Sequence, residues 1–258
     1  MRDAVFVVEG GSAQATPWAA GPWDPRLMHG GAPSALVAWA AEALEAPVPM
    51  RVARLTIDLL RPVPVGELAI EREVVRQGRK IQLCQVRLLS SGVEVTRGMV
   101  LKVRKEALDL PPGFAPPLDH PLPEALGPME TRPGAGNAFG DNFEMRRVHG
   151  GFGELGPGVA WFRQHRPLIA GEPLTPAMRA AAVADFSNGV SSVLPFDAWT
   201  FINGDLSVSL AREPQGEWIL TNAESWIGPD GAGVAMTRLA DIHGYFGTAT
   251  QSLVVERR

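Results

Sequence analysis

Cysteine is almost missing from this chain of 258 residues. Cys84 is the single one, so no disulfide can form within the chain, which is typical of proteins in a reducing cytoplasm. Basic charge is also scarce, because 24 lysines and arginines stand against 28 acidic residues and leave a net charge of −4. Without a basic cluster, the composition does not support binding to nucleic acid.

Signals for a membrane or for export are missing as well. No apolar run approaches the ~18–20 residues that a membrane-spanning helix requires. The first residues, Met1-Arg2-Asp3, include an acid and lead directly into a segment of alternating polarity, unlike a secretory signal. We therefore expect a cytoplasmic protein without a membrane span.

Motifs for cofactors, metals and covalent nucleophiles are absent or incomplete. The five histidines are scattered, with no two at the spacing of helical metal ligands, so no metal is expected. No serine lies in a G-x-S-x-G elbow. Residues 151–156 match a dinucleotide-binding pattern, but Pro157 and a strand-like run follow instead of a helix. Any hydrolysis would therefore use activated water and no cofactor.

The remaining composition is that of a soluble globular protein, with 45% apolar and 20% charged residues. The 28 glycines and 23 prolines argue against a helical bundle. Apolar residues at helical spacing predict a helix over Pro33–Leu44, with proline in its first turn. From Arg51 to Arg104, four alternating runs predict an antiparallel meander.

The second part of the chain follows the same order after a proline-rich segment, residues 106–140, which we expect to be an extended surface linker. A hairpin is predicted over 143–148 and 159–167. Thr175 and Pro176 then predict the start of a helix over Ala177–Gly189. Strand-like runs follow at 199–213, 217–227, 232–242 and 245–256.

The two parts are related by a nearly constant offset. Leu55–Leu59 corresponds to Leu206–Leu210 at 151 residues, and Met99 corresponds to Gln251 at 152 residues. This repeat predicts an α+β fold in which a sheet wraps one helix in each half, and the two sheets could pair along an edge. We expect three segments: residues 1–105, the linker 106–140, and residues 141–258.

Polar residues in the second copy that face apolar ones in the first are candidates for chemistry. Asp185 lies in the most apolar helix of the chain, where a buried carboxylate is suited to act as a general base. Gln251 is an amide in an apolar strand, and Asn203 opens a strand where the first copy has Val52. The alternatives are solvent-facing positions for Asp185 and Gln251 and a simple turn at Asn203-Gly204.

His29, Gly30 and Gly31 form a candidate substrate-binding segment before the first helix. Two glycines would let a backbone amide approach a ligand next to the positive end of the helix dipole. Such an amide could serve as an oxyanion-hole donor. The alternative is a glycine turn with a surface histidine.

These residues, together with several short motifs, resemble the acyl-CoA thioesterase II group of the hot-dog superfamily in its single-chain, double hot-dog form. The motifs are Met28–Gly31, Leu60–Gly66, Arg76–Arg79, Ala184–Gly189, Asp205-Leu206, Gly216–Trp218, Gly228–Gly231 and Ala249–Leu253. The resemblance implies a tandem hot-dog fold and an Asp–Thr–Gln set that holds the attacking water. Asp185 and Gln251 match that set, and Asn203 stands at the position of the threonine.

The resemblance implies hydrolysis of acyl-CoA thioesters to free acid and CoA, a role in lipid metabolism, and further association of the hot-dog sheets into a homo-oligomer. In this hypothesis Asp185 takes a proton from water held by Gln251 and Asn203. One alternative is a hot-dog enoyl-CoA hydratase or dehydratase, which needs an aspartate and a histidine close together. We rank it lower because His29 would have to be brought to Asp185 by the other half. The other alternative is a non-catalytic acyl-CoA-binding protein.

Overall fold

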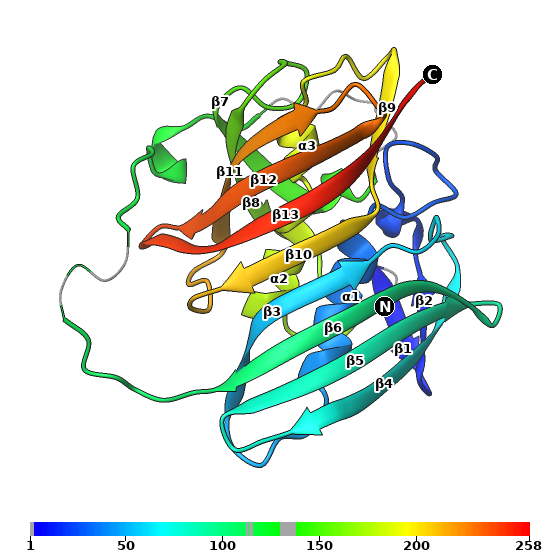
Figure 1. Cartoon of the computed structure of the whole chain (residues 1–258), viewed down its shortest axis with the longest axis vertical. Coiled ribbons are helices and arrows are strands. Elements are labelled where there is room, and N and C mark those ends of the chain that lie inside the picture. Colours follow the sequence, from blue (N-terminus) through cyan, green and yellow to red (C-terminus); the bar gives the residue numbers. More distant parts are fainter. Residues whose placement is uncertain (1–2, 112, 114–115, 130–137) are drawn as a thin grey trace.

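The computed structural model describes residues 3–111, 113, 116–129 and 138–258. Thirteen strands form one antiparallel sheet, which Figure 1 shows curving in front of the helices. In chain order the strands are β1 (Phe6–Glu9), β2 (Ser12–Ala15), β3 (Met50–Asp58), β4 (Glu67–Gln77), β5 (Ile81–Ser90), β6 (Val93–Arg104), β7 (Phe143–His149), β8 (Gly158–Gln164), β9 (Trp199–Asn203), β10 (Asp205–Leu210), β11 (Trp218–Ile227), β12 (Ala232–Asp241) and β13 (Gly244–Arg257). The α-helices are α1 (Gly31–Glu42), α2 (Pro176–Ala184) and α3 (Ser187–Val190), and short 3-10 turns lie at Pro17–Ala19, Pro123–Ala125 and Gly140–Asn142.

The two halves of the sheet join along β3 and β10, as predicted. Thr56 lies opposite Ser207 in this pairing, and its neighbours Leu55 and Ile57 lie opposite Val208 and Leu206. Thr56 and Ser207 are also 151 residues apart, the offset of the repeat. An approximate two-fold axis therefore passes through this pair, and it turns each half of the sheet onto the other.

The helix α1 lies behind the first half of the sheet and is almost entirely buried. Ten of its residues are buried, and it packs against β3, β4, β5, β6 and α2. It begins at Gly31, two residues before the predicted start, so that Pro33 still falls in the first turn. At Gly98 of β6 an added Cβ would overlap Cγ1 of Val37, so the helix and the sheet approach closely.

The second helix is shorter than predicted. Thr175 caps α2 as expected, because its hydroxyl accepts a hydrogen bond of 3.2 Å from the N–H of Met178. The prediction of one helix to Gly189 is wrong: α2 ends at Ala184, Asp185 is its C-cap, and α3 begins after Phe186. The hydroxyl of Ser187 donates to the Ala184 carbonyl at 2.6 Å, a local bond that competes with helical hydrogen bonding.

The predicted strand over 199–213 is also divided. It breaks at Gly204 into β9 and β10, and both strands pair with β13 at different places, Asn203 with Leu253 and Ser207 with Thr250. Asn203, the last residue before this break, contacts Asp185 at the end of α2.

The prolines of segment 106–140 predict an extended surface linker, and residues 106–111 are indeed exposed. Most of residues 116–129 are exposed as well, so the described part of this segment lies largely on the surface, although some of its residues pack on the second half of the sheet. Trp161 Nε1 donates to the Pro121 carbonyl at 2.9 Å, the Tyr245 hydroxyl donates to Asp119 at 2.6 Å, and Pro123 and Phe139 are buried. Pro112 and Pro133 lie outside the described residues.

No helix in the described part of the chain is long and apolar enough to cross a membrane.

Candidate active site

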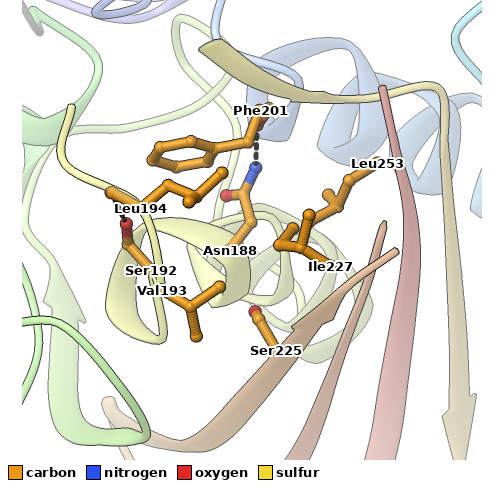
Figure 2. A pocket seen from close by; sticks show the side chains of 8 residues that line it. All are labelled: Asn188, Ser192, Val193, Leu194, Phe201, Ser225, Ile227 and Leu253. Atoms are coloured by element: carbon orange, nitrogen blue, oxygen red, sulfur yellow. Dashed lines mark hydrogen bonds between the residues drawn. The ribbon is translucent and has the colours of Figure 1, made fainter. Parts of the chain in front are cut away.

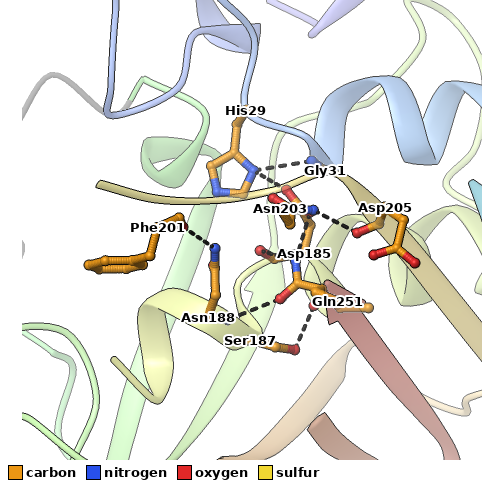
Figure 3. Close-up of polar contacts among 10 residues, drawn as sticks. His29, Gly31, Asp185, Ser187, Asn188, Phe201, Asn203, Asp205 and Gln251 are labelled. Carbon is orange, nitrogen blue, oxygen red and sulfur yellow. Dashed lines mark hydrogen bonds and ion pairs between the residues drawn. The ribbon is translucent and has the colours of Figure 1, made fainter. Parts of the chain in front are cut away.

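Asp185 lies at the break between α2 and α3, directly behind the sheet, and is only 3% exposed. One carboxylate oxygen, Oδ1, accepts hydrogen bonds from Asn203 Nδ2 at 2.8 Å and from Gln251 Nε2 at 3.1 Å. Figure 3 shows the two amides converging on the carboxylate from β9 and β13. The structure thus brings together the three residues that the sequence predicts as the catalytic set.

His29 completes this arrangement from the first half of the chain. Its Nδ1 lies 2.8 Å from Asp185 Oδ2, and its ring contacts those of Phe139 and Phe186, with centroid distances of 4.9 and 4.6 Å. In Figure 3 the second ring nitrogen, Nε2, points away from Asp185. Nε2 has no hydrogen-bond partner among the described residues. The argument that ranked the hydratase lower is therefore overturned, because the fold does bring a histidine to the aspartate.

Gly30 and Gly31 form the start of α1, and both lie in tight contact with this group. A Cβ on Gly30 would lie 2.7 Å from Asp185 Oδ2, so the carboxylate sits against the N-terminus of α1, where the helix dipole favours negative charge. The N–H of Gly31 donates to His29 Nδ1 at 3.1 Å and is thereby engaged. The N–H of Gly30 has no acceptor in the part of the chain that the structure describes.

The hydrogen bonds fix which end of each amide carries the nitrogen. Asn203 Nδ2 also donates to the Asp205 carbonyl at 3.0 Å, and an oxygen in its place would face two acceptors. Gln251 Oε1 accepts a hydrogen bond of 3.1 Å from the N–H of Asn188, so its Nε2 must face Asp185. Asn203 Oδ1 is left without a partner among the described residues and can accept a hydrogen bond from water.

Three neighbours of the site were not predicted. Asn188 lies on α3 and binds Gln251, and the signal that could have found it is a second polar residue beside Asp185 in the same apolar segment. Phe139 and Phe186 hold the imidazole ring of His29. Nothing in the sequence marks Phe139, because it lies at the end of a segment without periodicity.

A narrow pocket opens beside this group of residues, between α3 and the ends of β9, β11 and β13 (Figure 2). It encloses about 180 Å³ of empty space, part of it open to solvent, and is too narrow to admit a water molecule. Its wall is mainly apolar and is formed by Asn188, Ser192, Val193, Leu194, Phe201, Ser225, Ile227 and Leu253. Asn188 is thus shared between the pocket and the hydrogen-bond network of Asp185.

No group of three or more His, Cys, Asp or Glu residues that could hold a metal ion occurs among the described residues. Asp185 also has no lysine or arginine as an ion-pair partner there; its three side-chain partners are one imidazole and two amides. Such a carboxylate can hold and orient an imidazole or a water molecule.

Two family models match the chain, each over one half. The acyl-CoA thioesterase N-terminal domain matches residues 19–103, and the acyl-CoA thioesterase C-terminal domain matches residues 122–255. The chain belongs to the acyl-CoA thioesterase family. In this family member, His29 and Gly30 fall in the first matched domain, whereas Asp185, Asn203 and Gln251 fall in the second.

Solved structures similar to this acyl-CoA thioesterase family member cover almost all of it. A candidate thioesterase from Novosphingobium aromaticivorans is 21% identical, with 97% of this chain and 98% of that chain covered and a TM-score of 0.76. A hot-dog protein of unknown function from Alicyclobacillus acidocaldarius is 18% identical, with 98% and 97% covered and a TM-score of 0.76. An acyl-CoA thioesterase II from Mycobacterium marinum is 14% identical, with 97% and 94% covered and a TM-score of 0.64. These likenesses show the hot-dog fold. No curated protein matches the sequence of this family member.

Proposed function

We propose that this protein hydrolyses acyl-CoA thioesters to a free acid and CoA, with water activated at Asp185. The observation that carries the proposal is the environment of that carboxylate. It is buried, and it binds one imidazole and two amides that come from three separate elements of the chain. Buried and specifically partnered carboxylates of this kind are typical of acid–base sites. Membership of the acyl-CoA thioesterase family supports the choice of reaction.

The groups around Asp185 match the needs of this hydrolysis. Asn203 Oδ1 is positioned to accept a hydrogen bond from the attacking water. The N–H of Gly30 is the best candidate for the oxyanion donor, because it has no acceptor among the described residues. The Ser187 hydroxyl donates to the Ala184 carbonyl, which leaves water as the nucleophile. Water attacks the thioester carbonyl carbon, the C–S bond breaks, and the sulfur leaves with a proton.

The apolar pocket next to Asn188 supports the proposal that the substrate carries an acyl group. Its wall consists mainly of aliphatic and aromatic side chains, which favour the binding of a hydrocarbon chain. The pocket is closed too tightly for water, so an acyl chain would enter only when Leu194, Phe201 and their neighbours move apart.

The test is release of free thiol from short, medium, long and aromatic acyl-CoA esters by the wild type and by Asp185→Asn. The introduced amide oxygen could still accept hydrogen bonds from Asn203 and Gln251, so the variant should fold. We expect release by the wild type and a loss of about 10²–10⁴-fold in the variant. The matched control is Asp197→Asn, at an exposed position, which should keep full activity. Equal activity of wild type and Asp185→Asn would contradict the proposal.

The contact between His29 and Asp185 favours a second candidate, hydration of an enoyl-CoA, in which such a pair transfers protons to and from water. The two reactions are separated by their products. Hydration removes the absorbance of the conjugated double bond without releasing thiol, whereas hydrolysis releases thiol from saturated esters. Tight binding in titration calorimetry with neither product would indicate an acyl-CoA-binding protein instead.

A further inference from the structure

We propose that His29 is a catalytic residue: its Nε2 takes the proton of the attacking water and delivers it to the CoA sulfur. This inference rests on the proposed hydrolysis and names the atom that moves the proton. The hypothesis drawn from the sequence places this role on Asp185 and gives His29 only a part in substrate binding.

The first argument is access to the reacting atoms. The Asp185 side chain is 2% exposed, and both of its oxygens already have partners, Oδ1 with two amides and Oδ2 with His29. Gly30 closes the remaining side, because its Cα lies against the carboxylate. Each oxygen of Asp185 therefore already holds at least one partner in the structure. The His29 side chain is 10% exposed, and its Nε2 is unbonded among the described residues.

The second argument is the fixed orientation of the imidazole ring. Phe139 stacks on His29 at an interplanar angle of 27°, and Phe186 contacts its ring at 44°. Nδ1 lies 2.8 Å from Asp185 Oδ2 and 3.1 Å from the backbone N of Gly31, and it makes one of these hydrogen bonds at a time: it accepts from Gly31 when it is unprotonated and donates to Oδ2 when it carries the proton. Since these contacts prevent the ring from turning over, Nε2 keeps one direction (Figure 3).

The third argument concerns the proton between Nδ1 and Oδ2. When this proton lies on Nδ1, the N–H of Gly31 is released from Nδ1, Asp185 is charged and Nε2 offers a lone pair, which is the form that a general base requires. Asp185 then stabilises the imidazolium that forms when Nε2 gains a second proton. A carboxylate that orients a histidine acts in the same way in catalytic triads. Asn203 and Gln251 are positioning residues in this scheme, because their hydrogen bonds hold Asp185.

The step balances without any other reactant. The water oxygen forms a bond to the carbonyl carbon while one water proton moves to His29 Nε2. The tetrahedral intermediate then expels the sulfur, the C–S bond breaks, and the proton moves from Nε2 to the sulfur. His29 returns to its starting form, and the products are a carboxylic acid and the CoA thiol.

The decisive variant is His29→Gln in the full chain. A glutamine can donate a hydrogen bond to Asp185, so it replaces a histidine that only positions the carboxylate, but it cannot transfer a proton. We expect kcat for thiol release to fall about 10²–10⁴-fold with little change in KM. His29→Ala should recover part of its activity when imidazole is added, whereas Asp185→Asn should not. His243→Gln, in the exposed turn between β12 and β13, is the control and should remain fully active.

A measurement on the wild type guards against variants that fail to fold. Diethyl pyrocarbonate modifies accessible imidazole nitrogens, and hydroxylamine reverses the modification. We expect activity to be lost in step with modification of His29, as mapped by mass spectrometry, and to return with hydroxylamine.

The outcomes separate this inference from the proposed function. A wild type that releases no thiol overturns the hydrolysis and the role of His29 together. An active wild type, an inactive Asp185→Asn and a His29→Gln variant within about tenfold of the wild type would overturn the role of His29 alone, because general acid–base catalysis contributes more than that. Retained activity after complete modification of His29 would overturn it as well.

Discussion

The Cα of Gly30 lies so close to Asp185 that the carboxylate occupies the place of a side chain. A Cβ there would be 2.7 Å from Oδ2 and 3.0 Å from Oδ1, closer than real Cβ atoms come to other groups. Gly30 has an ordinary right-handed backbone, with φ of −57°, so glycine is required by this contact and not by its conformation. The contact joins α1 of the first half to the end of α2 in the second.

Gly30→Ala should therefore reduce activity more than stability. The added methyl group displaces the carboxylate and disturbs its contact with His29, and a misplacement of this size at a catalytic group costs about 10²-fold in rate. The measurement is kcat/KM for thiol release, together with the thermal unfolding midpoint. Gly66→Ala is the matched control, because nothing lies within 4 Å of a Cβ at that position. Similar activity in both variants would contradict the role of the close approach.

Asn203 is best tested with the isosteric pair Asn203→Thr and Asn203→Val. Threonine keeps a hydroxyl that can donate to Asp185, whereas valine leaves the carboxylate without this partner; both residues suit a strand. We expect the threonine variant to stay within about tenfold of the wild type and the valine variant to fall about 10²-fold or more, since it loses a charge-assisted hydrogen bond. Equal loss in both would mean that Asn203 acts by shape alone.

The carboxylate of Asp241 predicts how the stability of the folded protein depends on pH. Burial raises the pKa of Asp241, but hydrogen bonds from Arg212 and from the N–H groups of Gln215 and His243 outweigh burial and hold the pKa below its usual range. A lowered pKa in the folded state adds stability above the unfolded value of about 3.9, and this stability is lost as the pH falls through the folded value. Asp241→Asn should thus destabilise the protein by about 3–5 kcal/mol at neutral pH.

The check is urea unfolding of the wild type and Asp241→Asn at pH 7 and at the lowest pH where both fold. The difference in unfolding free energy should narrow in acid. Asp109→Asn, at an exposed position, should show no difference at either pH. A difference that stays constant with pH would argue that the variant acts through packing rather than charge.

Leu194→Ala should change the choice of substrate. Leu194 forms part of the pocket wall together with Ile227 and Leu253 (Figure 2), and its truncation leaves space for a longer or branched acyl group. Because each methylene in an apolar pocket changes selectivity about 10–200-fold, the ratio of kcat/KM for long over short esters should rise by about tenfold or more. Leu155→Ala, at a residue that is 60% exposed, is the control. An unchanged ratio would show that the acyl group binds elsewhere.

Elements with local signals were predictable from the sequence. The alternation of β3, β5 and β6 and the cap at Thr175 each depend on residues close together in the chain. The end of α2 was not predictable, because alanine-rich sequence favours a longer helix. The break at Asp185 depends on partners in other elements: His29 on one side and the amides of Asn203 and Gln251 on the other.

Three residues of the site were predictable from the sequence, but the contact that joins its two halves was not. The comparison of the two copies singled out Asp185, Asn203 and Gln251, since each replaces a residue of another kind in the first half. The position of His29 beside Asp185 follows from the two-fold relation across the β3–β10 pairing, which places the start of α1 against the end of α2. No local pattern carries that information, so the sequence alone could not connect the two.

The approximate two-fold axis at Thr56 and Ser207 has a consequence for stoichiometry. Two identical chains around such an axis would carry every site twice. Here the position corresponding to Asp185 is Ser34, whose buried hydroxyl has no hydrogen-bond partner in the described part of the chain, and Val52 and Met99 stand where the second half has Asn203 and Gln251. Calorimetric titration with a non-hydrolysable acyl-CoA analogue should accordingly show one binding site per polypeptide, and the first half can change its interior freely as long as it still presents His29 and Gly30.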